Sequence, residues 1–224
     1  AFPNSMVDRI TPVTTDAARE AVRSAHGVED SWPVVCEDWI QWVVEDRFPA
    51  GRPPWESLSG SLGGTCLLVE DVLPYELMKL RLLNGAHQAV CYCGILAGFR
   101  EVHDAMADPD ILRFIAKYMD AAGEAVPEVR GVDLHAYKAK TRERFANRAV
   151  KDQLLRLSED ARNRIQVACV PCLVAAPSAF RQPLAALVAC WIRYLAEPTD
   201  EAGVSFQASP DGASAELRPM AEAA

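Results

Sequence analysis

Three side chains able to do acid–base and hydrogen-bond chemistry stand in one short run, Met78–His87: Lys79, Asn84 and His87. In an α-helix, at about 100° per residue, Asn84 lies roughly 140° and His87 roughly 80° around the axis from Lys79. All three therefore share one broad face. A lysine on such a face is either solvated or held in a cleft, where burial favours the neutral amine that accepts a proton. The run predicts a general base if its helix lines a cleft.

Each of the three residues also has a purely structural interpretation. Taken from the helix alone, Lys79 is more often an exposed surface residue, and His87 is more often a buried histidine whose hydrogen bonds are satisfied. Asn84 could simply cap or bridge backbone groups. Their occurrence together on one face favours a site.

The helix that would carry these residues begins near Pro74, which suits a first helical turn, and runs to about Ala97. Residues 1–72 contain strand-like runs separated by loops, whereas residues 73–203 favour helices. We expect strands within 1–13, 33–46 and 66–72, and further helices near 15–24, 110–122, 133–145, 150–159, 165–175 and 183–195. The predicted fold class is mainly α, with a multi-helical C-terminal domain after a short α+β part. Residues 204–224 are rich in Ala, Glu, Ser and Pro and predict a mobile tail.

Several separated motifs resemble those of one known family. Phe2–Pro12 (FPNSMVDRITP) resembles the signature of the long-chain mannitol dehydrogenase family, and Met78–His87 (MKLRLLNGAH) resembles its catalytic helix. The runs at 35–46, 48–53 and 131–134, and the run RFAN at 144–147, continue the match in the same order. The resemblance covers nearly the whole chain, to about Gly203. Ordered motifs are far more specific than any one of them.

The resemblance implies a polyol dehydrogenase that interconverts a polyol and its ketose with NAD or NADP and without a metal. It implies that Lys79 is the general base, that Asn84 holds the oxygen whose charge develops during hydride transfer, and that His87 orients the substrate. It also implies that Val7 and Asp8 lie near the nicotinamide, with Asp8 near the substrate as well.

Arg164 is a further candidate, for binding a substrate hydroxyl, because the resemblance implies polar site residues near its segment. A surface arginine is the equal alternative. The runs QWVVED and FPAGRP resemble the polyol branch of the family more than its uronate or sugar-phosphate branches. The implied substrate is therefore mannitol, arabinitol or sorbitol.

The nucleotide-binding half of that family lies upstream of the signature, which starts here at residue 2. No G-x-G-x-x-G run opens a strand–turn–helix unit, and the glycine cluster of Gly60, Gly63 and Gly64 leads from loop into strand instead. Residues 1–72 then correspond to the end of an NAD-binding domain and residues 73–203 to a helical substrate and catalytic domain. We expect a C-terminal part that is inactive without an N-terminal Rossmann domain. The alternative is a non-catalytic module that binds a polyol or a partner.

Seven cysteines, an odd number scattered through apolar segments, suit a reducing cytoplasm better than a disulfide framework. Cys169 and Cys172 have the spacing of a redox motif, and with Cys91 and Cys93 they could form a four-cysteine zinc site. Free cysteines are mostly small buried hydrophobic residues, so we expect core positions and no metal, with zinc and thiol chemistry as alternatives.

Composition limits the partners of the chain. A formal net charge of −8 argues against nucleic acid, whose phosphates need basic surfaces. No apolar run reaches the roughly 18 residues of a membrane span. A small-molecule polyol or ketose is the expected ligand.

Overall fold

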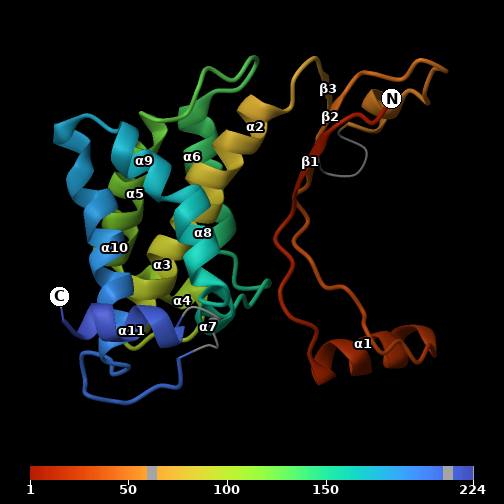
Figure 1. The fold of residues 1–224 in the computed structure, drawn as a ribbon. Coiled ribbons are helices and arrows are strands. Elements are labelled where there is room, and N and C mark those ends of the chain that lie inside the picture. Colours follow the sequence, from red (N-terminus) through yellow and green to blue (C-terminus); the bar gives the residue numbers. More distant parts are fainter. Residues whose placement is uncertain (60–64, 209–213, 224) are drawn as a thin grey trace. The chain divides into compact units, whose positions relative to one another are not determined.

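The computed structural model describes residues 1–59, 65–208 and 214–223, so the cluster of Gly60, Gly63 and Gly64 lies outside the described residues. The chain divides into two compact units, Ala1–Glu76 and Leu77–Ala224 (Figure 1). The sequence suggests a boundary after residue 72.

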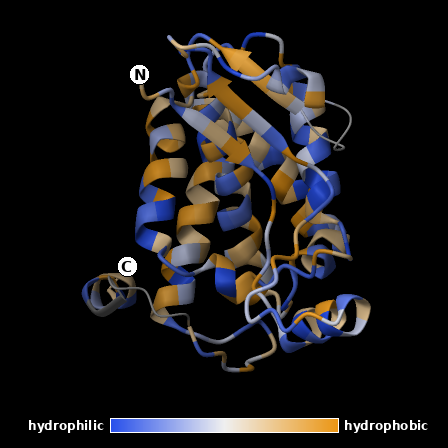
Figure 2. Ribbon diagram, turned by 90° about the vertical axis from the view of Figure 1, so that its right-hand side faces the viewer, coloured by the Kyte–Doolittle hydropathy of each residue, from blue (hydrophilic) through white to orange (hydrophobic). Residues whose placement is uncertain are grey.

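The first unit contains a three-stranded sheet in the order β1-β2-β3. β1 (Ser5–Asp8) pairs antiparallel with β2 (Gln41–Glu45), and β2 pairs parallel with β3 (Thr65–Val69). Figure 2 shows hydrophobic residues along these strands. In the short 3₁₀ turn η1 (Trp55–Leu58), the ring of Trp55 lies 5.1 Å from that of Trp42 on β2.

The strand expected over residues 33–46 is confirmed in its second half alone. Before β2, one of the two hydrogen bonds between Glu37 and Ile10 is made by a side chain. The Glu37 carboxylate accepts the Ile10 N–H at 2.6 Å, while the backbone N–H of Glu37 donates to the Ile10 carbonyl at 3.1 Å. An acidic side chain that captures a backbone donor ends regular pairing at that point.

Helix α1 (Asp16–His26) starts as its sequence predicts. The Thr15 hydroxyl accepts the Ala18 N–H at 3.2 Å, which satisfies one of the free donors of the first turn. Gly27 ends the helix in the left-handed conformation, at φ 64°, and donates to Arg23.

The second unit is helical and is built around α3 (Gly85–Leu96), nearly all of whose residues are buried. α3 contacts α4, α5, α7, α8 and α10 (Figure 1). Helix α2 (Leu73–Met78) spans the boundary between the two units. The other helices of the second unit are α4 (Val102–Ala107), α5 (Pro109–Gly123), α6 (Leu134–Phe145), α7 (Leu154–Leu157), α8 (Ala161–Ala168), α9 (Val170–Ala175), α10 (Arg181–Ala196) and α11 (Ser214–Glu222). The mainly α fold class is confirmed.

Several helices differ from the prediction. The helix expected over 165–175 is two helices, α8 and α9, because Pro171 lacks the N–H that a continuous helix would bond to Val167. Helix α4 was not predicted, and α7 is much shorter than the expected span 150–159. Helix α11 lies within 204–224, where the sequence predicts a mobile tail, and it contacts α10.

Within the described residues, no helix combines the length and the hydrophobicity that crossing a membrane requires.

Candidate active site

The helix that carries the candidate residues contains a widened turn between α2 and α3. Residues Lys79–Asn84 form a π-helical segment, η2, and the Gly85 N–H donates to the carbonyl of Leu80, five residues earlier. In such a turn, residue i+5 lies closer around the helix axis to residue i than the roughly 140° of an α-helix. The predicted angle between Lys79 and Asn84 is therefore too large, and the two residues lie on the same side of the helix.

His87 lies on the same side of the helix, in the first turn of α3. It lies three residues after Asn84, a spacing that makes two residues neighbours on a helix surface. Lys79 and Asn84 are half-buried, and neither side chain makes a hydrogen bond or ion pair with another described residue. The widened turn thus brings the three predicted residues together, with their polar groups available to a ligand.

Close packing explains why glycine follows Asn84. A Cβ at Gly85 would collide with the hydroxyl of Tyr118, a fully buried residue on α5. The Tyr118 hydroxyl donates to Cys169 Sγ at 3.6 Å. Gly85 therefore lets α5 approach the helix at the end of the π turn.

The His87 imidazole is buried, with 8% of the residue exposed. Its ring stacks on that of Phe145, at the end of α6, with centroids 4.0 Å apart and planes at 15°. Its Nε2 atom is buried and has no hydrogen-bond partner among the described residues. A ligand hydroxyl could form the hydrogen bond that this ring nitrogen lacks, on the same helix face as Lys79 and Asn84.

Four cations act on this imidazole. Burial, and then the charges of Arg156, Arg144, Arg164 and Lys79, hold the pKa of His87 well below its ordinary value of 6.5. His87 is therefore neutral at neutral pH, when one ring nitrogen donates and the other accepts a hydrogen bond. The same positive surroundings would stabilise negative charge that develops on a substrate oxygen.

The predicted residue Arg164 belongs to this cationic cluster, whereas Arg144 and Arg156 were missed. Arg164 is half-buried on α8, which contacts both η2 and α3, and its side chain makes no hydrogen bond or ion pair with another described residue. Arg144 lies in the run RFAN, so a sequence motif could have identified it. No motif marks Arg156, because tertiary packing alone brings it close to α3.

Arg156 is held by an acidic partner on its own turn. Its Nε and Nη2 atoms lie 3.0 and 2.5 Å from Asp152 Oδ1, and Asp152 is buried with 4% exposed. The second oxygen of Asp152 has no partner within the described residues. This buried carboxylate fixes Arg156 and partly offsets its charge.

Val7 and Asp8 belong to the first unit, on β1. Asp8 is buried, with 1% exposed, whereas Val7 is 52% exposed, so their side chains leave opposite faces of the strand. A cofactor lying on one face of the sheet would contact one of the two side chains. Asp8 pairs in register with Gln41, whose buried Oε1 has no partner among the described residues.

Two family models match the chain. Residues 71–223 match the mannitol dehydrogenase C-terminal domain, and residues 1–57 match the mannitol dehydrogenase Rossmann domain. The chain belongs to the mannitol dehydrogenase family. The resemblance seen in the sequence is thereby confirmed.

Curated relatives of this mannitol dehydrogenase family member agree. Mannitol 2-dehydrogenase of Aspergillus terreus is 41% identical over 210 residues, which cover 92% of this chain and 41% of the relative. Mannitol dehydrogenase DSF1 of Saccharomyces cerevisiae is 42% identical over 197 residues, covering 86% of this chain and 38% of the relative. The chain thus spans less than half the length of these relatives.

Solved structures show the same relation. A Pseudomonas fluorescens mannitol 2-dehydrogenase, in a ternary complex with NAD and D-mannitol, is 40% identical with a TM-score of 0.84, covering 99% of this chain and 44% of that one. A D-sorbitol dehydrogenase in substrate-free form is 32% identical with a TM-score of 0.81, covering 97% and 45%.

Four cysteines of this family member were considered for a redox or zinc centre: Cys91, Cys169 and Cys172 are buried, and Cys93 is half-buried. Cys169 precedes α9, and burial raises its pKa to about 12 and that of Cys172 to about 11. Burial also raises the pKa of Cys91 and of Cys93. The raised pKa of each of the four thiols disfavours the thiolate, which is the reactive form of a cysteine.

One group of potential metal ligands stands in the described part of the chain, and it contains no cysteine: Glu101, His103 and Asp104. The two ring nitrogens of His103 lie 3.3 Å from one carboxylate each. These three side chains contact one another at the start of α4.

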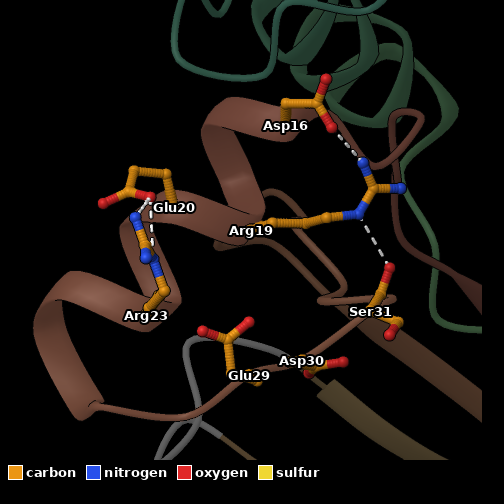
Figure 3. A pocket seen from close by; sticks show the side chains of 7 residues that line it. All are labelled: Asp16, Arg19, Glu20, Arg23, Glu29, Asp30 and Ser31. Atoms are coloured by element: carbon orange, nitrogen blue, oxygen red, sulfur yellow. Dashed lines mark hydrogen bonds and ion pairs between the residues drawn. The ribbon is translucent and has the colours of Figure 1, made fainter.

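A surface hollow beside α1 is lined by charged side chains of both signs (Figure 3). Arg19 pairs with Asp16 and also donates to the Ser31 carbonyl at 2.9 Å, and Arg23 pairs with Glu20. Since its basic side chains are already paired with acidic neighbours, this hollow does not rival the face of Lys79.

Proposed function

We propose that the chain is the substrate-binding and catalytic part of an NAD(P)-dependent polyol dehydrogenase, which interconverts mannitol, arabinitol or sorbitol and its ketose. The observation that carries the proposal is that Lys79, Asn84 and His87 share one face of a widened helix in a member of this family. The relative in complex with NAD and D-mannitol supports the choice of cofactor and of substrate class.

In the proposed reaction, Lys79 is the general base that takes the proton of the reacting hydroxyl. The bound nicotinamide supplies the hydride acceptor. The Asn84 amide donates to the oxygen as its negative charge develops, and the cationic surroundings of His87 add to this stabilisation. The neutral imidazole of His87 orients the substrate, with Arg164 beside it to hold a further hydroxyl.

The first unit itself carries features that suit contact with a dinucleotide. Exposed Val7 offers an apolar contact for a flat ring, and the unsatisfied Gln41 oxygen beside Asp8 is a polar atom without a partner in the described residues. The Rossmann model matches residues 1–57, and no glycine-rich fingerprint stands in this chain. We therefore propose that the dinucleotide is held together with further Rossmann sequence, and that the chain alone is inactive.

The proposed chemistry needs no metal, because the lysine and the hydrogen-bond donors take the place of a Lewis acid. All seven cysteines are free, which is in keeping with the cytoplasm, where we place the enzyme.

Oxidation assays on the enzyme that carries this chain test the proposal. D-Mannitol, D-sorbitol and D-arabinitol are offered with NAD or NADP, with and without a chelator, and reduced nicotinamide is measured. We expect turnover of at least one polyol and no effect of the chelator. Binding of a polyol without NAD and without turnover would favour the non-catalytic module, and loss of activity restored by zinc would favour a metal enzyme.

A further inference from the structure

The C-terminal end of α6 is fixed by the asparagine of the run RFAN. Asn147 Oδ1 accepts the Ala149 N–H at 3.0 Å, and the Asn147 N–H donates to the Arg144 carbonyl at 3.2 Å. The Asn147 carbonyl in turn accepts the Val150 N–H at 3.2 Å. A turn closed by its own asparagine leaves little freedom to the helix end before it. The backbone position of Phe145 is thereby set.

The ring of Phe145 covers one face of the His87 imidazole. The two ring centroids are 4.0 Å apart, the planes meet at 15°, and Phe145 is 2% exposed. The outer side-chain torsion of a histidine has a broad energy profile, so packing has to select the plane of the ring. A parallel ring at this distance leaves little room for any tilt of the imidazole.

We propose that Phe145 is a positioning residue: its ring sets the plane of the His87 imidazole, and with it the direction in which Nε2 meets a substrate hydroxyl. This inference rests on the proposed role of His87 in binding the substrate. In this proposal the run RFAN has two parts: Asn147 holds the turn after α6, and Phe145 sets the plane of the His87 ring.

The stacked pair has two other interpretations, and the structure disfavours the first. If His87 were protonated, Phe145 would serve as a cation–π partner, but burial and the four surrounding cations keep the imidazole neutral. If Phe145 only filled space, its shape would be of little consequence, and a leucine of similar bulk would serve. The second interpretation is the one that an experiment has to exclude.

The first test is spectroscopic and needs no activity. The chain has four histidines, so the ring protons of His87 can be assigned by NMR with the His87→Gln variant as the reference. We expect these protons to be shifted upfield by the Phe145 ring current in the wild-type chain. The shift should be lost in Phe145→Leu and kept in Phe145→Tyr. An unchanged shift in Phe145→Leu would overturn the proposal.

The second test is a double-mutant cycle on kcat/KM for the polyol. Misplacement of a positioned group costs up to about 10²-fold, so we expect Phe145→Leu to lower kcat/KM between about tenfold and about 10²-fold. Phe145→Tyr should restore most of this loss, and KM for the nicotinamide should not change. In a His87→Ala background, Phe145→Leu should cost nothing further, because its effect passes through His87.

A matched control is Phe206→Leu, which removes another stacked ring of the same unit, 5.4 Å from that of Tyr194. It should leave kcat/KM unchanged. Equal losses from Phe145→Leu with and without His87 would show a merely structural role and overturn the inference. If His87→Ala itself left kcat/KM unchanged, the proposed function would fail, while the NMR shift would still report on the stacking.

Discussion

His87 combines properties that a substrate-orienting residue needs. Its Nε2 has no partner among the described residues, its ring stacks on that of Phe145, and burial together with the cations around it keeps it uncharged. A neutral imidazole can donate to one hydroxyl oxygen and accept from another group, whereas an imidazolium can only donate. Because His87 stays neutral, the four positive charges around it do not repel it.

The depressed pKa of His87 makes the stability of the fold depend on pH. In the unfolded chain the imidazole takes up a proton near its ordinary pKa of 6.5, whereas in the folded chain it does so at a much lower pH. The unfolded state therefore binds more protons in this window. We expect the free energy of unfolding to fall below pH 6.5 by up to about 1.4 kcal/mol per pH unit.

Urea unfolding of the chain at pH values from about 5 to about 8 measures this dependence. The control is His87→Gln, which cannot titrate and whose stability should vary less with pH over the same range. Equal slopes for the two proteins would contradict a neutral, buried His87.

At the scale of elements, the π-helical segment η2 sets the spacing of the candidate residues. Lys79 and Asn84 are five residues apart, and a turn bonded from residue i to residue i+5 brings them closer around the helix axis than an α-helix would. The sequence does not reveal this extra residue in the turn, since the run KLRLLN is compatible with an ordinary α-helix. The next residue, Gly85, is more telling, because glycine lowers helix propensity and its missing side chain makes room for Tyr118 of α5.

Replacement of Gly85 by alanine tests this close approach. The new Cβ would meet the Tyr118 hydroxyl, and overpacking of this kind costs about 1–3 kcal/mol of stability. We expect Gly85→Ala to unfold at lower denaturant, and the added change Tyr118→Phe to recover part of the loss by removing the hydroxyl.

The matched control is Gly123→Ala on α5, where the nearest atom to a new Cβ, Lys138 Nζ, is 3.9 Å away. Alanine there should be neutral or stabilising, because it is the better helix former. If Gly85→Ala were as stable as Gly123→Ala, the packing of Tyr118 against the π turn would not constrain position 85.

At the scale of the whole molecule, the sequence was sufficient where its signals are local. The Thr15 cap predicted α1, and the ordered motifs predicted the family and the division into a short sheet part and a helical part. The break at Pro171 was missed because apolar periodicity outweighed the lost hydrogen bond. Of the cationic cluster, Arg164 was predicted and Arg144 lay in a noted run, whereas Arg156 could not be predicted, since tertiary packing alone brings it close to α3.

One comparison of variants tests the proposed roles most directly: steady-state polyol oxidation by Lys79→Ala beside Lys117→Ala, in which an exposed lysine on α5 is replaced. Loss of a positioned base costs roughly 10²–10⁴-fold, so Lys79→Ala should lower turnover by that factor, while Lys117→Ala should turn over as the wild type does. Retention of more than half of the activity by Lys79→Ala would contradict its role as the base.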